Sequence, residues 1–190
     1  MSDNITSKSN NKAAHRRSVW PRRLATGFLV LCWMLIIGSF SAQSGAESGS
    51  LSRSVAKKVV TVEEKLTRQT YTNEERDTRI EHMQLPIRKL AHMAEYAILA
   101  MLLTLHLGCY ALAKGVKAAT NSFYLRLFLA WLISAVYAAT DEIHQLFVDS
   151  RNGSFTDVCI DSAGAFLGLF CLWIFCKIFK RHREKDKKYQ

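Results

Sequence analysis

The chain has 190 residues, of which 49 % are hydrophobic, and a formal net charge of +10. Its hydrophobic residues lie in long blocks, which favours a single helical membrane bundle over soluble domains. Of the 26 Lys and Arg residues, 13 lie before Leu24 or after Cys176, beside the hydrophobic blocks, and no nucleic-acid-binding motif is visible, so we expect no nucleic-acid partner.

The first 40 residues combine a basic segment with an apolar one. Residues 1–23 are polar and basic, and we expect a disordered cytoplasmic tail there. Residues 24–40 are uncharged and, as a helix, would extend about 26 Å, close to the hydrocarbon thickness of about 30 Å. They form the first predicted span. A secretory signal peptide is the alternative, because a basic start, an apolar core and small residues near Ser41 are its usual ingredients.

Residues 41–89 carry charges of both signs, so we expect an extracytoplasmic segment between the first and second spans. Five apolar residues in it recur at steps of three and four, which predicts one face of an amphipathic helix. This helix would lie on the outer membrane surface or cap the bundle. The alternative is a solvated helix that packs loosely on its neighbours. The five residues are Leu51, Val55, Val59, Val62 and Leu66.

Thr72 and Glu75 have the spacing of a capping box, which predicts a second short helix from Thr72. Pro86 is predicted in the first turn of the following helix, where its missing N–H is not needed. That helix contains the second predicted span, residues 90–112, which is followed by Lys114 and Lys117.

The third and fourth spans are predicted at residues 123–141 and 158–179. The uncharged stretch 127–140 is too short for a span of about 20 residues, so the third helix must include Arg126 or acidic residues at its other end. The fourth helix similarly has to include Asp161.

Gly164 and Gly168 form a small-xxx-small face on the fourth predicted helix, which would allow close contact with a neighbouring helix. The fold class that follows from all these segments is an all-α multi-pass membrane bundle of about four transmembrane helices, occupying residues 24–179.

The distribution of basic residues predicts the orientation of the bundle. Six Lys and Arg residues precede Leu24, and seven follow Cys176. Three, counting Arg126, lie at the loop between the second and third spans, whereas the loop between the third and fourth spans has only Arg151. By the positive-inside rule, both termini are cytoplasmic, including the basic tail 180–190.

With this topology, four polar sequence pieces reach the outer face together. Ionisable groups at membrane depth are costly and normally face the interior of a bundle, so we expect a polar, outward-opening pocket. The candidate catalytic residues are His92, Glu95, Glu142 and His144. The candidate substrate-binding residues are Arg88, Asp141, Gln145, Arg151 and Asp157.

Several functions remain open for these residues. General acid–base chemistry could use the His and Glu groups, and binding of a polar headgroup could use Arg88 and Arg151 without any chemistry. A metal site with His92 and His144 is a further alternative, although the usual zinc-protease helix motif is absent. No cofactor is assigned. The structural alternatives are ion pairs between helices and, for Asp157, a role in capping a helix.

At these residues the sequence resembles the VanZ-like family of bacterial membrane proteins. The resemblance covers residues 40–168 and depends on the order of its pieces. They are Phe-Ser-x-Gln at 40–43, Arg-Lys-x-x-His-x-x-x-Tyr at 88–96, Asp-Glu-x-His-Gln at 141–145, and Arg151 with Asp157 ahead of Gly164. Members often have Pro-Gly before the arginine, and Asp149-Ser150 stands there in this chain.

The resemblance implies a multi-pass protein of the bacterial cytoplasmic membrane, connected with the cell envelope. The family takes its name from a member associated with resistance to the glycopeptide antibiotic teicoplanin, and it does not imply an enzyme. The leading hypothesis is therefore binding or modulation of an envelope component. The alternatives are an enzyme acting on a lipid or lipid-linked substrate, and a small transporter. The expected partners are the lipid bilayer and a lipid or lipid-linked envelope molecule; no oligomeric state is assigned.

Overall fold

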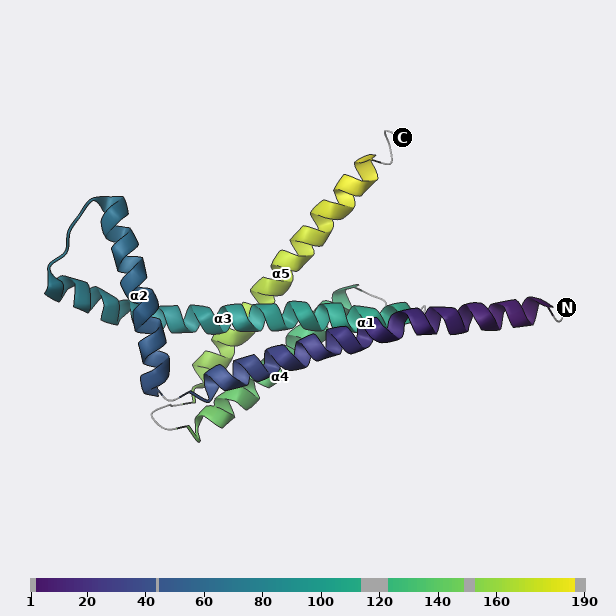
Figure 1. Cartoon of the computed structure of the whole chain (residues 1–190), viewed down its shortest axis with the longest axis horizontal. Helices are drawn as coiled ribbons and strands as arrows, with labels where there is room; N and C mark the ends of the chain where they lie inside the picture. Colours follow the sequence, from purple (N-terminus) through teal and green to yellow (C-terminus); the bar gives the residue numbers. More distant parts are fainter. Residues whose placement is uncertain (1–2, 44, 114–122, 149–152, 187–190) are drawn as a thin grey trace.

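A computed structural model describes residues 3–43, 45–113, 123–148 and 153–186, and their side chains over 20–43, 48–110, 123–148 and 153–182. All regular structure in these ranges is α-helical (Figure 1). The helices are α1 (Asp3–Ser41), α2 (Gly45–Thr67), α3 (Asn73–Ala113), α4 (Phe123–Gln145) and α5 (Phe155–Asp186). Within the described ranges, α1, α3, α4 and α5 are long and apolar enough to cross a membrane. The prediction of an all-α multi-pass bundle is confirmed.

The helical segments that contain the candidate membrane spans are Trp20–Ser41, Asn73–Tyr110, Phe123–Gln145 and Phe155–His182. Each includes or overlaps one of the spans predicted from the sequence. The α3 segment begins well before the predicted span 90–112, because the polar first half of this helix continues directly into its apolar second half. The α1 helix begins at Asp3 and so includes most of the basic segment for which the sequence predicts disorder. No side chain before Trp20 is described, and disorder of this tail stays a prediction.

The α3 helix differs from the prediction at Pro86, which lies inside one continuous helix. The capping box at its start is present: the Thr72 N–H donates to Glu75 Oε2 at 2.9 Å, and the Glu75 N–H donates to Thr72 Oγ1 at 3.3 Å. The prediction of a separate short helix, with Pro86 opening the next one, is wrong. A proline inside a helix costs about 3 kcal/mol, but Ile80 and Ile87, on either side of it, both belong to one apolar cluster with α2, and this packing stabilises the helix before and after the proline.

The α2 helix runs crosswise to α1 and α3 at one end of the bundle (Figure 1). The side that packs on α3 presents Ser52, Ala56 and Val60, with Ile80 of α3 against them. The apolar stripe predicted from the sequence is exposed instead, and Leu66 in it is 80 % exposed. An amphipathic helix is therefore present, but the stripe predicted from the sequence faces away from α3, and the side of α2 with Ala56 and Val60 packs on it.

A cluster at the α2–α3 connection holds these two helices together. Arg79 Nη1 lies 2.9 Å from Glu63 Oε1, and its guanidinium carbon lies 4.0 Å from the centre of the Tyr71 ring. The Tyr71 hydroxyl donates a hydrogen bond to Glu63 at 3.1 Å. Desolvation and the hydrogen bond to Glu63 raise the pKa of Tyr71. Arg68 has a φ of 55°, the left-handed conformation that commonly ends a helix.

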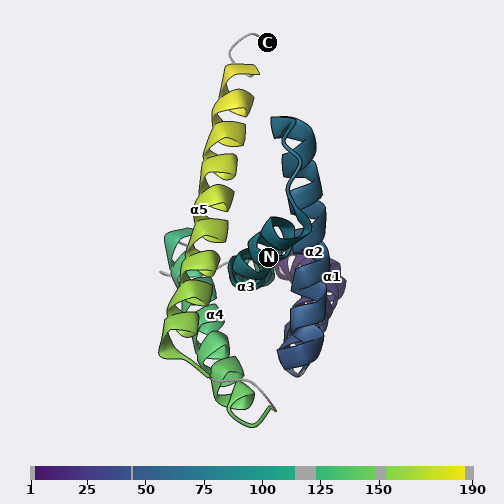
Figure 2. The same ribbon diagram turned by 90° about the vertical axis from the view of Figure 1, so that its left-hand side faces the viewer.

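The α3 helix is the centre of the bundle, with α4 and α5 on one side and α1 and α2 on the other (Figure 2). A single buried cluster joins the four spanning helices, and many large apolar side chains point outward, as a lipid-facing surface requires. The buried members of the cluster are Val30, Ile37, Tyr96, Leu99, Ala100, Leu103, Ala130, Ala138, Ala165 and Leu169.

The contact between α3 and α5 is a backbone contact. A Cβ atom added to Gly168 would lie 2.7 Å from the carbonyl oxygen of Ala97, and one added to Gly164 would clash with the carbonyl oxygen of Met93. The small-xxx-small pair therefore lies in the α3–α5 interface. Beyond this contact α5 leans away from α3 toward its C-terminal end (Figures 1 and 2).

Three aromatic side chains hydrogen-bond to backbone carbonyls of neighbouring helices. The indole N–H of Trp33 donates to the carbonyl oxygen of Glu95 at 2.9 Å, and that of Trp131 donates to the carbonyl oxygen of Ser162 at 3.1 Å. The Tyr137 hydroxyl donates to the carbonyl oxygen of Met34 at 2.7 Å. Such bonds within a membrane contribute about 0.6 kcal/mol each on average. Two of the three join α1 to another spanning helix, α3 or α4.

Candidate functional site

The polar side chains of the spanning helices gather near α2. We call this the α2 end of the bundle, and we call the opposite end, where α1 and α5 run to the termini, the terminal end (Figure 1). The C-terminal ends of α1 and α4, the start of α5 and the middle of α3 meet there. The described residues of the four sequence pieces singled out above lie here.

A buried hydrogen-bonded network joins α1 to α4. Ser41, the last residue of α1, donates from Oγ to Asp141 Oδ2 at 2.8 Å. Gln145 Nε2 donates to Ser41 Oγ at 2.8 Å and to Asp141 Oδ2 at 3.3 Å. All three residues are buried. Since a buried carboxylate needs donors, this network explains how Asp141 is accommodated at the end of a membrane helix.

Glu142 binds the turn between α4 and α5. Its Oε2 accepts the backbone N–H of Ser154 at 2.8 Å, and Ser154 Oγ accepts the N–H of Thr156 at 3.2 Å. A carboxylate and a serine hydroxyl at the start of a helix are favourable, because they satisfy free N–H groups and complement the helix dipole. A Cβ atom on Gly153 would clash with the Glu142 carbonyl, so the turn requires glycine.

Two further pairs come from α3. His92 Nδ1 lies 3.5 Å from Glu95 Oε2, and both side chains are less than one-fifth exposed. Lys89 Nζ donates to Asp157 Oδ1 of α5 at 2.7 Å. The candidate binding residue Asp157 is therefore paired with Lys89, which lies in the Arg-Lys-x-x-His motif but was not counted among the candidate site residues.

The Lys89–Asp157 pair is partly exposed, and we expect its removal to matter little. Screening and side-chain entropy limit such pairs to about 0–1 kcal/mol. Asp157→Asn should therefore shift the unfolding temperature in detergent by no more than a few degrees, and raising the salt concentration should reduce the difference from wild type. A loss of folded protein would show that the pair supports the α3–α5 contact far more strongly than its exposure indicates.

A cavity of about 410 Å³ opens between the end of α1, α2 and α3. Its lining is mixed. The polar side chains include Gln43, Arg88, His92 and Glu95, and the apolar ones include Phe40, Leu51, Val55 and Ile87. Arg88 makes no ion pair with any carboxylate in the described part of the chain. The cavity thus combines a cationic group with an apolar wall.

The remaining candidates differ in position. His144 is exposed and makes no described contact with His92 or Glu95, so these two histidines are not brought together. Arg151 lies outside the described residues. Within the described ranges, no group of three or more His, Cys, Asp or Glu side chains is arranged to hold a metal ion.

Two buried residues near the network were not among the predicted candidates. Asp161 of α5 is 2 % exposed and lies within electrostatic reach of Asp141, Glu142 and Asp157. Tyr96 is fully buried with its ring centre 6.1 Å from that of Tyr137. The sequence contained one signal for Asp161, because this residue lies inside an otherwise apolar stretch of the fourth predicted span.

The arrangement defines a multi-pass helical membrane protein whose polar groups are concentrated at one end of the bundle. A sequence model of the VanZ/LLP1 family matches residues 26–176, most of the chain. The chain belongs to this family, as the resemblance in its motifs predicted. No curated protein and no solved structure matches it.

Proposed function

We propose that the protein binds an amphiphilic component of the bacterial envelope, a lipid or lipid-linked molecule with an anionic headgroup, in the cavity at the α2 end. The observation that supports this is the lining of the cavity. Arg88 has no ion-pair partner among the described carboxylates, and an anionic group would supply one. The apolar side chains Phe40, Leu51 and Val55 offer a surface for a hydrocarbon chain.

We also propose that the α2 end faces the outside of the cell and that both termini are cytoplasmic. The terminal segments of the chain carry 13 of its 26 Lys and Arg residues, which by the positive-inside rule favours the cytoplasm. With this placement the apolar stripe of α2 would face the outer leaflet, and Leu51 and Val55 of that stripe also line the cavity.

Catalysis is a second candidate because His92 and Glu95 are paired on the cavity wall. A histidine beside a carboxylate can act as a general base on a substrate hydroxyl or water. Transport is less well supported: the buried Thr104 and Ser134, deeper in the spans, each bond to a carbonyl of their own helix. Within the described residues they do not extend the polar groups of the α2 end across the bundle.

The binding proposal is tested by identifying what co-purifies with the full-length protein. We expect an anionic amphiphile in the wild type and a loss of roughly ten- to a hundredfold in Arg88→Gln, because a hydrogen bond to a charged group contributes about 1.5–3 kcal/mol. Mass spectrometry of extracted lipids gives the measurement. The control is Lys57→Gln, which removes one positive charge from an exposed position of α2 outside the cavity lining.

Equal recovery of anionic amphiphiles from wild type and Arg88→Gln would contradict the proposal. Glu95→Gln separates binding from catalysis. If the protein only binds, the amount of bound amphiphile should change while its chemical structure stays the same. If it catalyses, an unprocessed form should accumulate on the variant.

A connection with teicoplanin is proposed from family membership alone. Expression of the wild-type chain in a susceptible strain should raise the inhibitory concentration of teicoplanin, and Arg88→Gln at equal abundance should not. If wild type and Arg88→Gln raised the inhibitory concentration equally, any resistance would not depend on the Arg88 cavity.

A further inference from the structure

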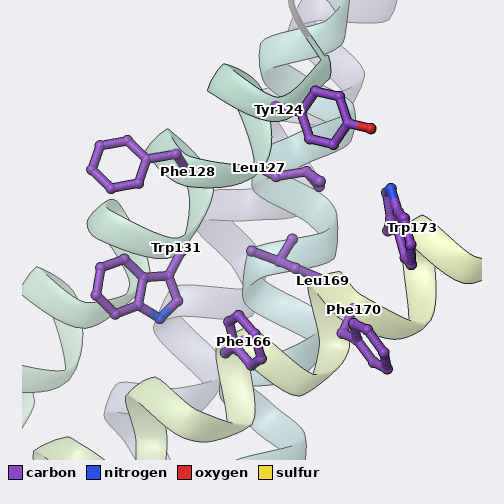
Figure 3. A pocket seen from close by; sticks show the side chains of 8 residues that line it. All are labelled: Tyr124, Leu127, Phe128, Trp131, Phe166, Leu169, Phe170 and Trp173. Atoms are coloured by element: carbon purple, nitrogen blue, oxygen red, sulfur yellow. The ribbon is translucent and has the colours of Figure 1, made fainter.

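An apolar groove of about 500 Å³ runs between α4 and α5 on the outside of the bundle, in the half nearer the terminal end (Figure 3). The α4 side presents Leu127 and Trp131, and the α5 side presents Phe166, Phe170 and Trp173. The groove forms because α5 leans away from the other helices as it runs toward its C-terminus (Figure 1). This region is separate from the cavity at the α2 end.

The α5 wall of the groove is a ladder of aromatic rings. The Phe166 and Phe170 rings have centres 6.4 Å apart with an interplanar angle of 11°, and Phe170 and Trp173 follow at 5.9 Å and 24°. These rings follow one another along the helix on a side that faces lipid, since Phe166 and Phe170 are exposed. Such a wall matches an extended acyl chain lying parallel to α5.

A positive charge stands at the terminal end of the ladder. Lys177 lies one helical turn beyond Trp173, with Nζ 4.8 Å from the centre of the Trp173 ring, and it is followed by the exposed Lys180 and Arg181. The sequence has no Asp or Glu in residues 4–46, 96–140 or 162–183. Lys177, the cation at the end of the ladder, therefore has no Asp or Glu within six residues along α5; the first that follows is Glu184, four residues after Lys180.

We propose that an anionic phospholipid of the leaflet at the terminal end occupies this groove, with an acyl chain along the aromatic ladder and its phosphate on Lys177. A lipid phosphate supplies a negative charge beside Lys177, where the chain places no carboxylate within six residues. A second copy of the chain would place its own Lys177, Lys180 and Arg181 against the first set, and like charges would repel. The charge distribution therefore favours a lipid over a dimer contact.

Tryptophan quenching tests this proposal with two probes that differ only in headgroup. The full-length protein is placed in phosphatidylcholine vesicles that contain a small, equal fraction of either brominated phosphatidylglycerol or brominated phosphatidylcholine. We expect the phosphatidylglycerol to quench more, with a local enrichment of about fivefold for one lysine. Lys177→Gln should remove the enrichment, and the matched Lys57→Gln at the α2 end should retain it.

The location is tested with two tryptophan variants. Trp173→Phe should lose much of the headgroup-dependent quenching, whereas Trp20→Phe should keep it. Equal quenching by both brominated lipids in the wild type, or an enrichment that persists in Lys177→Gln, would overturn the proposal. A dimer that shields Trp173 from both lipids would also overturn it. Arg88→Gln should leave this quenching unchanged, so the proposed function at the other end can fail or succeed independently.

Discussion

Replacing Gly168 with leucine is expected to prevent most of the protein from folding. A Cβ atom at this position would lie 2.7 Å from the Ala97 carbonyl oxygen and 2.8 Å from Ala97 Cα and Cβ. These are largely backbone atoms of α3, which cannot move aside as a flexible side chain would. Overpacking in a well-packed core typically costs about 1–3 kcal/mol, and the rest of the leucine side chain would force α5 further away.

Abundance in the membrane and the unfolding temperature of the purified protein measure this effect. Gly168→Ala should give a smaller loss in the same direction. Gly49→Leu is the matched control, because nothing lies within 4 Å of the Cβ position at Gly49 in α2. If Gly168→Leu and Gly49→Leu were equally abundant and equally stable, the close contact between α3 and α5 would be contradicted.

Removal of the Asp141 carboxylate should be the most damaging change among the polar residues. Asp141→Ala leaves the buried Ser41 hydroxyl without its acceptor and removes one of two acceptors of the Gln145 amide. A buried polar group that loses its partner costs about 1–3 kcal/mol. We therefore expect a clear decrease in unfolding temperature and weaker attachment of α1, measured by thermal unfolding in detergent.

A double-mutant cycle shows whether the network is the cause. Ser41→Ala and Asp141→Ala together should cost less than the sum of the two single changes, because they remove both sides of one hydrogen bond. Thr140→Ala is the neighbouring control, since its hydroxyl is exposed and bonds only to the Tyr137 carbonyl of its own helix. Strict additivity of Ser41→Ala and Asp141→Ala would contradict a direct interaction.

The spanning helices could be predicted from the sequence because hydrocarbon exposure restricts composition over a fixed length. The bounds of α4 follow from its apolar block and the polar residues at both of its ends. The prediction at Pro86 was wrong because a local rule for helix starts does not include the packing of Ile80 and Ile87 on α2, on both sides of the proline. The buried side of α2 was not predictable from hydrophobicity, since Val60 packs on α3 while the valines of the predicted stripe, Val55, Val59 and Val62, stay exposed.

The sequence predicted the region in which the candidate site lies, but it did not predict which side chains contact one another there. Spacing along one helix places Asp141 near both His144 and Gln145, and only the rotation of α4 against α1 decides that Gln145 is buried while His144 is exposed. Similarly, the partner of Asp157 is Lys89 of another helix. Contacts between helices depend on rotation and tilt, which periodicity within each helix does not specify.

The most direct test of the account is the side of the membrane that each end of the bundle faces. The five cysteines Cys32, Cys109, Cys159, Cys171 and Cys176 are replaced, and single cysteines are introduced as Leu66→Cys in α2 or Arg181→Cys in α5. A membrane-impermeant maleimide should label Leu66→Cys in intact cells and Arg181→Cys only after permeabilisation. Labelling of Arg181→Cys in intact cells, with Leu66→Cys protected until permeabilisation, would contradict a binding cavity that opens to the outside.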